Sequence, residues 1–344
     1  MRFVIDKAIP FIQGVFEPYA DVVYMECDRI GPDDVRDADA LIVRTRTRCD
    51  AALLAGSSVK IIATATIGTD HIDLPWCDAH GILVRNAAGC NAGGVAQYVF
   101  SALYGIASRN AIQLEGKTLG IIGVGNVGRR IENMAQTLGF RILRNDPPRA
   151  AAEGPYEFCD LDTLLATSDI VTMHVPLTPQ TRGMADRGFF KKMKPGAIFI
   201  NAARGEVVDE AALLEAIPRL GPVIIDTWNH EPDVNRELME KVAIATPHIA
   251  GYSYQGKQNG TAAAVRAVAH YFGISELQEF FPKTEHPEDE AVKLDVRGRK
   301  QGEIAAMFQY NYPIFTDDFF FRLHPDAFET LRSEYRYRRE FYFD

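Results

Sequence analysis

The sequence predicts an α/β protein with two doubly wound parallel sheets, followed by a small C-terminal α+β domain. Two successive series of short apolar runs alternate with helix-like segments, as in parallel sheets that are covered by helices. The composition then changes after about residue 273. A chain of 344 residues is long enough for two or three domains.

The first series occupies residues 1–90. Its expected strands are the segments RFVID, DVVYM, ALIVR, KIIATA and ILVRN. One long buried helix is expected over residues 94–109, because GVAQYVFSALYGIASR repeats apolar side chains at helical spacing. The second series begins with KTLGIIGVG and continues through DIVTMHVPL, GAIFINAARG, PVIIDTW and VAIATPHIAG.

The last part of the chain has a different character. The segment ISELQEFFPKTEHPEDE is acidic and contains proline, which is typical of a linker. The final segment, IFTDDFFFRLHPDAFETLRSEYRYRREFYFD, is rich in aromatic residues and arginine. It is too apolar for a disordered tail. We therefore expect it to pack against other parts of the chain.

Charge and cysteine content argue against several classes of protein. The net charge of −9 disfavours a nucleic-acid partner, since phosphate binding needs a basic face. The N-terminus lacks the apolar core of a signal peptide, and no apolar run approaches the roughly 18 residues of a membrane span. The cysteines form no C-x-x-C pair, and no metal-ligand spacing is present. We expect a cytoplasmic protein with reduced thiols, no metal site and no membrane partner.

A glycine-rich segment predicts the cofactor. GIIGVGNVGRRI carries G-x-G-x-x-G at Gly123, Gly125 and Gly128, after an apolar strand and at the start of a helix, and Asp146 ends the next strand. This combination predicts a Rossmann-like site, in which the glycines allow a tight turn and bring the pyrophosphate to the helix N-terminus. Asp146 can accept hydrogen bonds from the ribose and would repel a 2′-phosphate, so NAD is favoured over NADP. The nearby cation Arg149 weakens that preference slightly.

Three polar segments follow expected strands of the second series: NAARGEVVDE, DTWNHEPD and TPHIAGY, which contain Arg204, Glu231 and His248. Strand carboxyl ends in an open α/β sheet line the crevice where ligands bind. Arginine can bind a carboxylate with two parallel N–H groups. Histidine exchanges a proton near neutral pH, and a carboxylate can orient its ring. The three residues therefore predict an acid/base site for a small anionic substrate.

The order and spacing of GVGNVG, NAARGEVVDE, HEPD and PHIAG resemble the D-isomer-specific 2-hydroxyacid dehydrogenase family over residues 1 to about 272. The resemblance implies an NAD-dependent enzyme in which Arg204 anchors the substrate and Glu231 and His248 form the acid/base pair. It also implies further cofactor contacts, at Asn126, Val127, Val175, Asp226 and Gly251. For Asp226, a structural role at the end of its strand is an equal alternative.

Members of this family split their substrate domain around the cofactor domain. Carried over to this chain, residues 1–95 and 255–272 form a substrate-binding domain, and residues 96–254 form an NAD-binding Rossmann domain. Residues 273–344 resemble the extra C-terminal dimerisation domain of one branch of the family. That resemblance implies a homodimer held through the C-terminal domain.

The same branch acts on a phosphorylated 2-hydroxy acid. DADALIVRTRT and ATATIGTDHID resemble its two substrate loops and contain Arg44, Thr45 and Thr66. HIAGYSYQGK resembles its loop after the histidine and contains Tyr252. Arg44 and Tyr252 are the best candidates for binding the substrate phosphate. The hinge helix departs from the family at Gln97, where glutamate is common.

Two other functions remain open from the sequence. One is a dehydrogenase for another 2-hydroxy acid, such as glyoxylate, hydroxypyruvate or 3-phosphoglycerate. The tail and the loop with Tyr252 argue against it. The other is a protein that binds NAD as a sensor without useful catalysis, and the intact set of Arg204, Glu231 and His248 argues against that.

Overall fold

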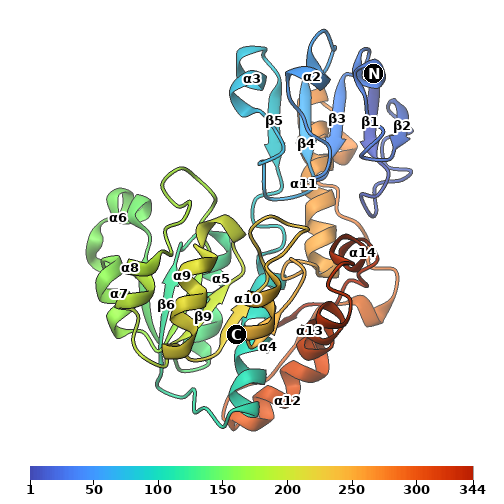
Figure 1. Cartoon of the computed structure of the whole chain (residues 1–344). Helices are drawn as coiled ribbons and strands as arrows, with labels where there is room; N and C mark the ends of the chain where they lie inside the picture. The colour runs from blue at the N-terminus through green and yellow to red at the C-terminus, as the bar shows by residue number, and fades with distance from the viewer. Residues whose placement is uncertain (344) are drawn as a thin grey trace. The chain divides into compact units, whose positions relative to one another are not determined.

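A computed structural model describes residues 1–343 of the chain (Figure 1). The chain divides into two compact units. The first contains residues 1–91 and 253–290, and the second contains residues 92–252 and 291–343. The expected C-terminal domain of residues 273–344 therefore contributes to both units, and the division of the chain into three domains stays a prediction.

The first unit is built on a five-stranded parallel sheet with the order β2-β1-β3-β4-β5. All five strands that the sequence predicted are present. Their bounds are Arg2–Asp6 (β1), Asp21–Met25 (β2), Ala40–Val43 (β3), Ile61–Thr64 (β4) and Leu83–Asn86 (β5). Three short helices and one long helix accompany them: Pro32–Val35 (α1), Ala51–Leu54 (α2), Leu74–Ala79 (α3) and Tyr254–Phe272 (α11).

Side chains alternate between the two faces of this sheet. Phe3 and Ile5 of β1 are fully buried in one core, where α11 packs. Val4, between them in the sequence, is fully buried in a second core with residues of α1, α2 and α3. Strands with both faces covered are expected to be apolar throughout, which explains the uninterrupted runs in the sequence.

The second unit is built on a six-stranded parallel sheet with the order β11-β10-β9-β8-β6-β7. The direction of the strand order reverses between β6 and β8. The bounds are Thr118–Ile122 (β6), Arg141–Asn145 (β7), Ile170–Met173 (β8), Ile198–Asn201 (β9), Val223–Ile225 (β10) and Ile244–Ala245 (β11). In a doubly wound sheet, the crevice at such a reversal is where a dinucleotide binds.

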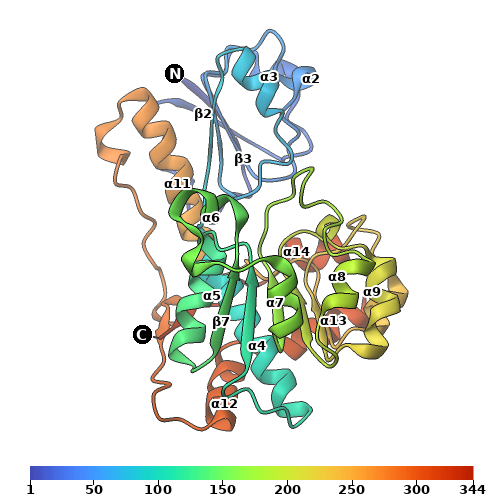
Figure 2. The same ribbon diagram turned by 90° about the vertical axis from the view of Figure 1, so that its left-hand side faces the viewer.

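Helices cover both faces of the second sheet (Figure 2). The predicted long helix spans Ala92–Arg109 (α4) and shares one core with Asn126–Thr137 (α5). The helices of the other core are Leu161–Thr167 (α7), Arg187–Lys192 (α8), Glu210–Ala216 (α9) and Arg236–Lys241 (α10). A short exposed helix, Pro147–Glu153 (α6), follows β7. The two units thus confirm the predicted doubly wound α/β class.

Residues 291–343, called the tail from here on, pack within the second unit, as the apolar composition of the final segment predicted. The tail forms three helices, Gln301–Asn311 (α12), Ile314–Leu323 (α13) and Phe328–Ser333 (α14), and a two-stranded parallel sheet, Val292–Lys293 (β12) with Phe341–Tyr342 (β13). These elements confirm the expected small α+β addition to the fold. Within residues 1–343, none of the helices is both long enough and apolar enough to cross a membrane.

The tail also covers the exposed edge of the second sheet. The Asp318 carboxylate on α13 accepts a hydrogen bond from the backbone N–H of Ala245 in the edge strand β11, at 2.7 Å. Arg322, one turn later, donates to Asp318 at 2.8 Å and to the carbonyl of Val242 at 2.9 Å. An unpaired edge strand is a template for unwanted pairing with other chains. Here α13 takes up part of that hydrogen-bonding capacity.

Candidate active site

The glycine fingerprint forms a tight turn between β6 and α5. Gly123 has a φ of +85°, a conformation that favours glycine. Gly128 lies so close to this turn that a Cβ there would be 2.2 Å from the Gly123 carbonyl oxygen. Gly125 is the N-cap of α5, and a Cβ on it would meet nothing within 4 Å. The N-terminus of α5 is therefore accessible to a pyrophosphate, which fits the predicted dinucleotide.

Asp146 lies at the end of β7 and is fixed by backbone N–H groups. Its carboxylate accepts hydrogen bonds from Val124 at 2.8 Å and from Arg149 at 3.1 Å. The Arg149 guanidinium is paired with Glu153, at 2.7 and 2.6 Å, and also donates to the Val124 carbonyl at 2.8 Å. Because Arg149 already has a carboxylate partner, it weakens the preference for NAD less than its sequence position suggested.

The other predicted cofactor residues lie at carboxyl ends of strands or at the N-terminus of α5. Asn126 and Val127 start α5, and Val175 follows β8. Asp226 follows β10 directly, and Gly251 lies in the loop that follows β11. All of them belong to the second unit, on the side where the sequence analysis placed the cofactor. Their contacts with NAD stay predictions.

Asp226 holds the loop that carries the candidate histidine. This carboxylate is buried, with 1% exposure, and accepts hydrogen bonds from the Thr246 hydroxyl at 2.7 Å, the Ile249 N–H at 2.8 Å and the Ala250 N–H at 3.0 Å. Burial raises the pKa of Asp226, while the His248 charge and these hydrogen bonds oppose the rise. The structural role weighed for Asp226 is thus present, and it is compatible with a further contact to the cofactor.

Glu231 and His248 form the pair that the sequence predicted. His248 Nδ1 lies 2.8 Å from Glu231 Oε2. The second carboxylate oxygen, Oε1, accepts the Trp228 N–H at 2.9 Å, so Glu231 is held at both oxygens. Because an ionised carboxylate only accepts hydrogen bonds, Nδ1 carries the proton and Nε2 is left as the free acceptor.

The electrostatic environment favours an ionised Glu231. Burial alone would raise its pKa, but the His248 charge, the hydrogen bond from His248 and the Trp228 N–H outweigh burial, and the net pKa is lowered. His248 itself has a φ of +55°, unusual for a residue with a Cβ. Its N–H donates to the Asp226 carbonyl at 2.8 Å, which holds this conformation. Strained backbone of this kind concentrates at functional sites.

The loop that carries Arg204 makes a close backbone approach to the segment before Glu231. Arg204 follows β9 and precedes Gly205, where a Cβ would lie 2.0 Å from the Trp228 carbonyl. The Asn201 side chain fixes the turn by donating to the Arg204 carbonyl at 3.0 Å and accepting from the Ala203 N–H at 3.1 Å. The loop with Arg204 thus packs directly on the backbone that leads to Glu231. The three predicted residues lie in the loops that follow β9, β10 and β11 of the second sheet.

The tail reaches the loop after His248, a feature that the sequence analysis did not foresee. The buried Arg338 donates to the carbonyls of Ile249 at 3.1 Å and Tyr252 at 3.2 Å, and also to that of Ala250. Asp226 binds the N–H groups of the same loop, so the loop is held from both sides. The donors of Arg338 are therefore used inside the chain.

Arg338 also explains the departure from the family at Gln97. The side-chain oxygen Oε1 of Gln97 accepts a hydrogen bond from Arg338 Nε at 3.2 Å. The side-chain nitrogen Nε2 of Gln97 donates to the backbone carbonyl of Arg339 at 3.0 Å. A glutamate could accept the first hydrogen bond but could not donate the second. Gln97 is fully buried, so both interactions are made without water. The amide at this position thus anchors the tail to the hinge helix α4.

Tyr252 lies against the same part of the tail. Its ring contacts the rings of Tyr335 and Tyr337, with centroids 6.0 and 6.4 Å apart. The Arg332 guanidinium is 5.8 Å from the centroid of the Tyr252 ring. The predicted substrate tyrosine is therefore positioned by tail residues. Composition showed that the tail must pack, but it could not show that it packs here.

The remaining predicted substrate residues belong to the first unit. Arg44 pairs with the fully buried Asp6 through Nε at 2.8 Å and Nη2 at 3.3 Å. Thr66 shares a hydroxyl hydrogen bond with Thr64 at 2.7 Å, and Thr45 is exposed. The negative charge of Asp6 balances the positive charge of Arg44. What Arg44 offers a phosphate is therefore mainly hydrogen-bond donors, and not a net positive charge. The substrate roles of Arg44, Thr45 and Thr66 stay predictions.

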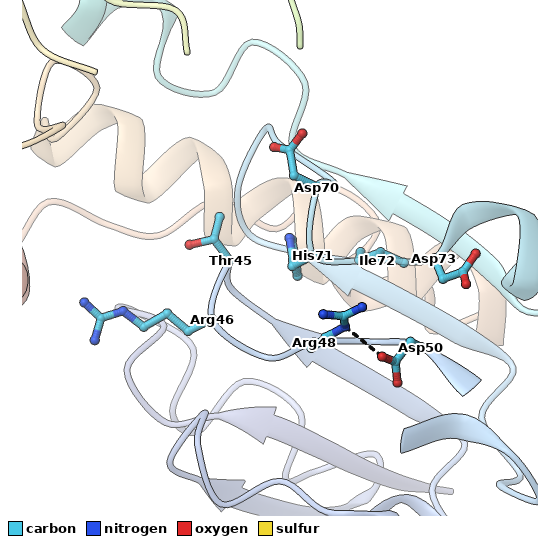
Figure 3. Close-up of a pocket in the computed structure, with 8 residues that line it drawn as sticks. All are labelled: Thr45, Arg46, Arg48, Asp50, Asp70, His71, Ile72 and Asp73. Atoms are coloured by element: carbon cyan, nitrogen blue, oxygen red, sulfur yellow. Dashed lines mark hydrogen bonds and ion pairs between the residues drawn. The ribbon is translucent and has the colours of Figure 1, made fainter. Parts of the chain in front are cut away.

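A cleft of about 370 Å³ joins the two predicted substrate loops of the first unit. Figure 3 shows its lining residues, with Arg48 paired to Asp50 at 2.7 Å and Arg46 extending away from that pair. The lining comprises Thr45, Arg46, Arg48, Asp50, Asp70, His71, Ile72 and Asp73. Its carboxylates outnumber its guanidinium groups, which does not favour a phosphate in this cleft.

Comparison with known proteins agrees with this geometry. The family model described as "D-isomer specific 2-hydroxyacid dehydrogenase, NAD binding domain" matches residues 101–250. A Bacteroides fragilis erythronate-4-phosphate dehydrogenase is 42% identical over 99% of this chain and 97% of its own length. The chain belongs to the D-isomer-specific 2-hydroxyacid dehydrogenase family. Similar relatives include erythronate-4-phosphate dehydrogenases from Bacteroides thetaiotaomicron, 43% identical over 99% of this chain and 97% of its own length, and Escherichia coli O157:H7, 38% identical over 99% and 92%.

Solved structures of 2-hydroxyacid dehydrogenases share the fold. The 3-phosphoglycerate dehydrogenase of Entamoeba histolytica with bound NAD⁺ is 28% identical, covers 81% of this chain and 97% of its own, and has a TM-score of 0.67. The D-lactate dehydrogenase of Aquifex aeolicus, with NAD and lactic acid, is 23% identical with a TM-score of 0.65, over 82% of this chain and 98% of its own. The predicted family and the NAD cofactor are confirmed, and so is the dehydrogenase class of enzyme.

Proposed function

We propose that the protein oxidises 4-phospho-D-erythronate to 2-oxo-3-hydroxy-4-phosphobutanoate with NAD, a reaction of pyridoxal 5′-phosphate biosynthesis. The observation that carries the proposal is the near full-length similarity to erythronate-4-phosphate dehydrogenases, tail included, in a chain whose Arg204, Glu231 and His248 all belong to the second unit. The tail matters for the choice of substrate, because Arg338 of the tail binds the loop that carries His248 and Tyr252.

The chain's own residues account for the proton and the anion of this reaction. His248 Nε2 accepts the proton of the C2 hydroxyl, and Glu231 stabilises the imidazolium that forms. Arg204 binds the carboxylate and the C2 oxygen with its guanidinium fork. When NAD is bound at the Gly123–Gly128 turn, it supplies the acceptor for the hydride from C2. The site needs no metal for this chemistry, and residues 1–343 contain no group of three His, Cys, Asp or Glu arranged to hold one.

We also infer that the enzyme works as a homodimer through its C-terminal residues. The support is a set of exposed apolar side chains on α12 and α13: Tyr310, Phe319, Phe320 and Leu323 are 83%, 60%, 47% and 55% exposed. Large exposed apolar side chains that gather on one surface often mark an interface. Sedimentation velocity on the purified protein tests this inference, and a monomer at micromolar concentration would contradict it.

The substrate proposal is tested by turnover. We expect the purified enzyme to reduce NAD with 4-phospho-D-erythronate at a higher kcat/KM than with 3-phosphoglycerate, D-glycerate or glycolate. Preference for 3-phosphoglycerate would move the protein to another branch of the family. NADH binding without hydride transfer to or from any 2-hydroxy or 2-oxo acid would instead favour the sensor alternative.

The carboxylate of Glu231 fixes the proton on Nδ1 of His248 and stabilises the imidazolium, and Glu231→Gln tests both functions. The glutamine amide can accept or donate, so Nδ1 can become the acceptor and the proton can move to Nε2, where a base is needed. We expect kcat to fall substantially but less than the roughly 10²–10⁴-fold that general acid–base catalysis contributes. Steady-state kinetics measure this loss, and Glu210→Gln, which removes the charge of a neighbouring carboxylate, serves as the matched control. Equal losses in the two variants would count against a specific role for Glu231.

A further inference from the structure

The proposed substrate has two anionic groups, whereas Arg204 accounts for only one of them. The inference below therefore rests on the proposed function. The second unit offers another guanidinium near Tyr252, on the last turn of α14. Arg332 is largely buried, with a side-chain exposure of 15%. A largely buried cation at this place in the fold needs an explanation, because burying a charge is costly unless anions compensate it.

The hydrogen-bond donors of Arg332 are only partly used, because the guanidinium bonds the Tyr252 side chain and makes one long contact with Glu329. Nη1 lies 3.5 Å from Glu329 Oε1, a long contact to a side chain that is 45% exposed. Nε is buried and has no hydrogen-bond partner among residues 1–343. The plane of the guanidinium lies near the rings of Phe328 and Tyr252, at 5.4 and 5.8 Å from their centroids. Aromatic neighbours of this kind hold the guanidinium in place.

Arg332 also lies within electrostatic reach of the acid/base pair. Its charge contributes to the lowered pKa of Glu231, after the larger effects of burial, His248 and Trp228. Burial alone would lower the pKa of Arg332, but its interactions with Tyr252 and with the charge of Glu231 outweigh burial and raise it. The charge of Arg332 therefore acts on the carboxylate that pairs with His248.

We propose that Arg332, together with Tyr252, binds the phosphate group of the substrate and so determines specificity for a phosphorylated acid. A guanidinium fork gives a phosphate two parallel charge-assisted hydrogen bonds. The Nε–H that lacks a partner and one terminal N–H form such a fork. Tyr252, held by the same segment of the tail, supplies a hydroxyl donor beside it. The tail would thus select the substrate in addition to shaping the fold.

The test uses Arg332→Gln and Arg332→Lys, with Arg336→Gln as the control, because Arg336 is an exposed cation four residues later. Loss of a hydrogen bond to a charged group predicts that Arg332→Gln lowers kcat/KM for 4-phospho-D-erythronate by roughly 10–100-fold. Turnover of unphosphorylated D-erythronate should be unchanged, and Arg332→Lys should be intermediate. Equal losses with both substrates would show that Arg332 acts through Glu231 or the fold, and no loss with either would also overturn the proposal.

A second measurement keeps the anion site separate from the substrate proposal. If the wild-type enzyme does not turn over 4-phospho-D-erythronate, the proposed function fails, and inorganic phosphate then serves as the probe. Calorimetric titration of the NADH complex should show phosphate binding in the wild type and in Arg336→Gln, and much weaker binding in Arg332→Gln. The same affinity in all three proteins, or no binding to the wild type, would overturn the assignment of Arg332.

Discussion

Replacing His248 with asparagine is expected to lower kcat for oxidation of the 2-hydroxy acid by roughly 10²–10⁴-fold, the usual contribution of a general acid–base group. Asparagine tolerates the left-handed backbone that His248 adopts at φ +55°, so the loop should keep its path. It cannot take up the substrate proton, however, and it removes the partner of Glu231. NADH binding should be retained, because the Gly123–Gly128 turn is unaffected. Steady-state kinetics and a fluorescence titration with NADH measure the two properties.

His230 provides a matched control for this experiment. It also has a positive φ, +59°, but its side chain is exposed and is not part of the acid/base pair. His230→Asn should therefore make the same chemical change in a similar backbone conformation without a comparable loss of turnover. If His248→Asn kept the wild-type rate, the assignment of His248 as acid/base would be wrong. If both variants lost NADH binding, the effect would be on folding and not on proton transfer.

Residues that act through local sequence were well predicted. Gly123, Gly125 and Gly128 specify a turn through their own backbone geometry, which a short motif can report. Arg204 and His248 each lie three residues after the end of a strand, and parallel strands place their carboxyl ends together. Chain order alone therefore predicted that these residues would meet. Glu231 was predicted in the same way, and its hydrogen bond to His248 gives the geometry that the pattern implied.

Contacts between distant parts of the chain were not predictable in this way. Arg338 reaches Gln97 across 241 positions, and nothing in either local segment encodes that pairing. Similarly, the pairing of Arg44 with Asp6 depends on β1 and β3 lying side by side, which sets both residues at adjacent strand ends. Composition showed that the tail was rich in aromatic residues and arginine. Only the packing shows that its buried arginine serves the active-site loop.

Replacing Arg338 with methionine is expected to cost the second unit roughly 3–5 kcal/mol of unfolding free energy, as when one member of a buried ion pair is removed. Methionine fills similar space but donates no hydrogen bonds, so the carbonyls of Ile249 and Tyr252 lose their partner. Burial already raises the pKa of Asp317, and the Arg338 charge opposes that rise. Without Arg338, the buried Asp317 carboxylate keeps the hydrogen bonds from Tyr312 and Tyr335 but loses the charge that opposes its raised pKa.

The measurement can be confined to the second unit, because the chain has only two tryptophans. Trp228 is buried in that unit, and Trp76 belongs to the first, so Trp76→Phe leaves Trp228 as the single fluorescent reporter of urea unfolding. In this background, Arg338→Met should unfold at lower urea concentration. A midpoint equal to that of the parent would show that the tail's arginine is dispensable for the fold.

Measurements of turnover distinguish two roles for Arg338: holding the loop after His248 in place, and contributing to the stability of the whole second unit. Arg338 and Asp226 bind opposite sides of the backbone that follows His248, so removing one side frees the histidine to leave its position against Glu231. Below the unfolding transition, Arg338→Met should therefore have a reduced kcat although it remains folded. Arg338→Lys keeps the charge near Asp317 but has no planar fork to reach several carbonyls at once. It should recover more stability than turnover, whereas proportional recovery of both would indicate that the tail acts on the fold alone.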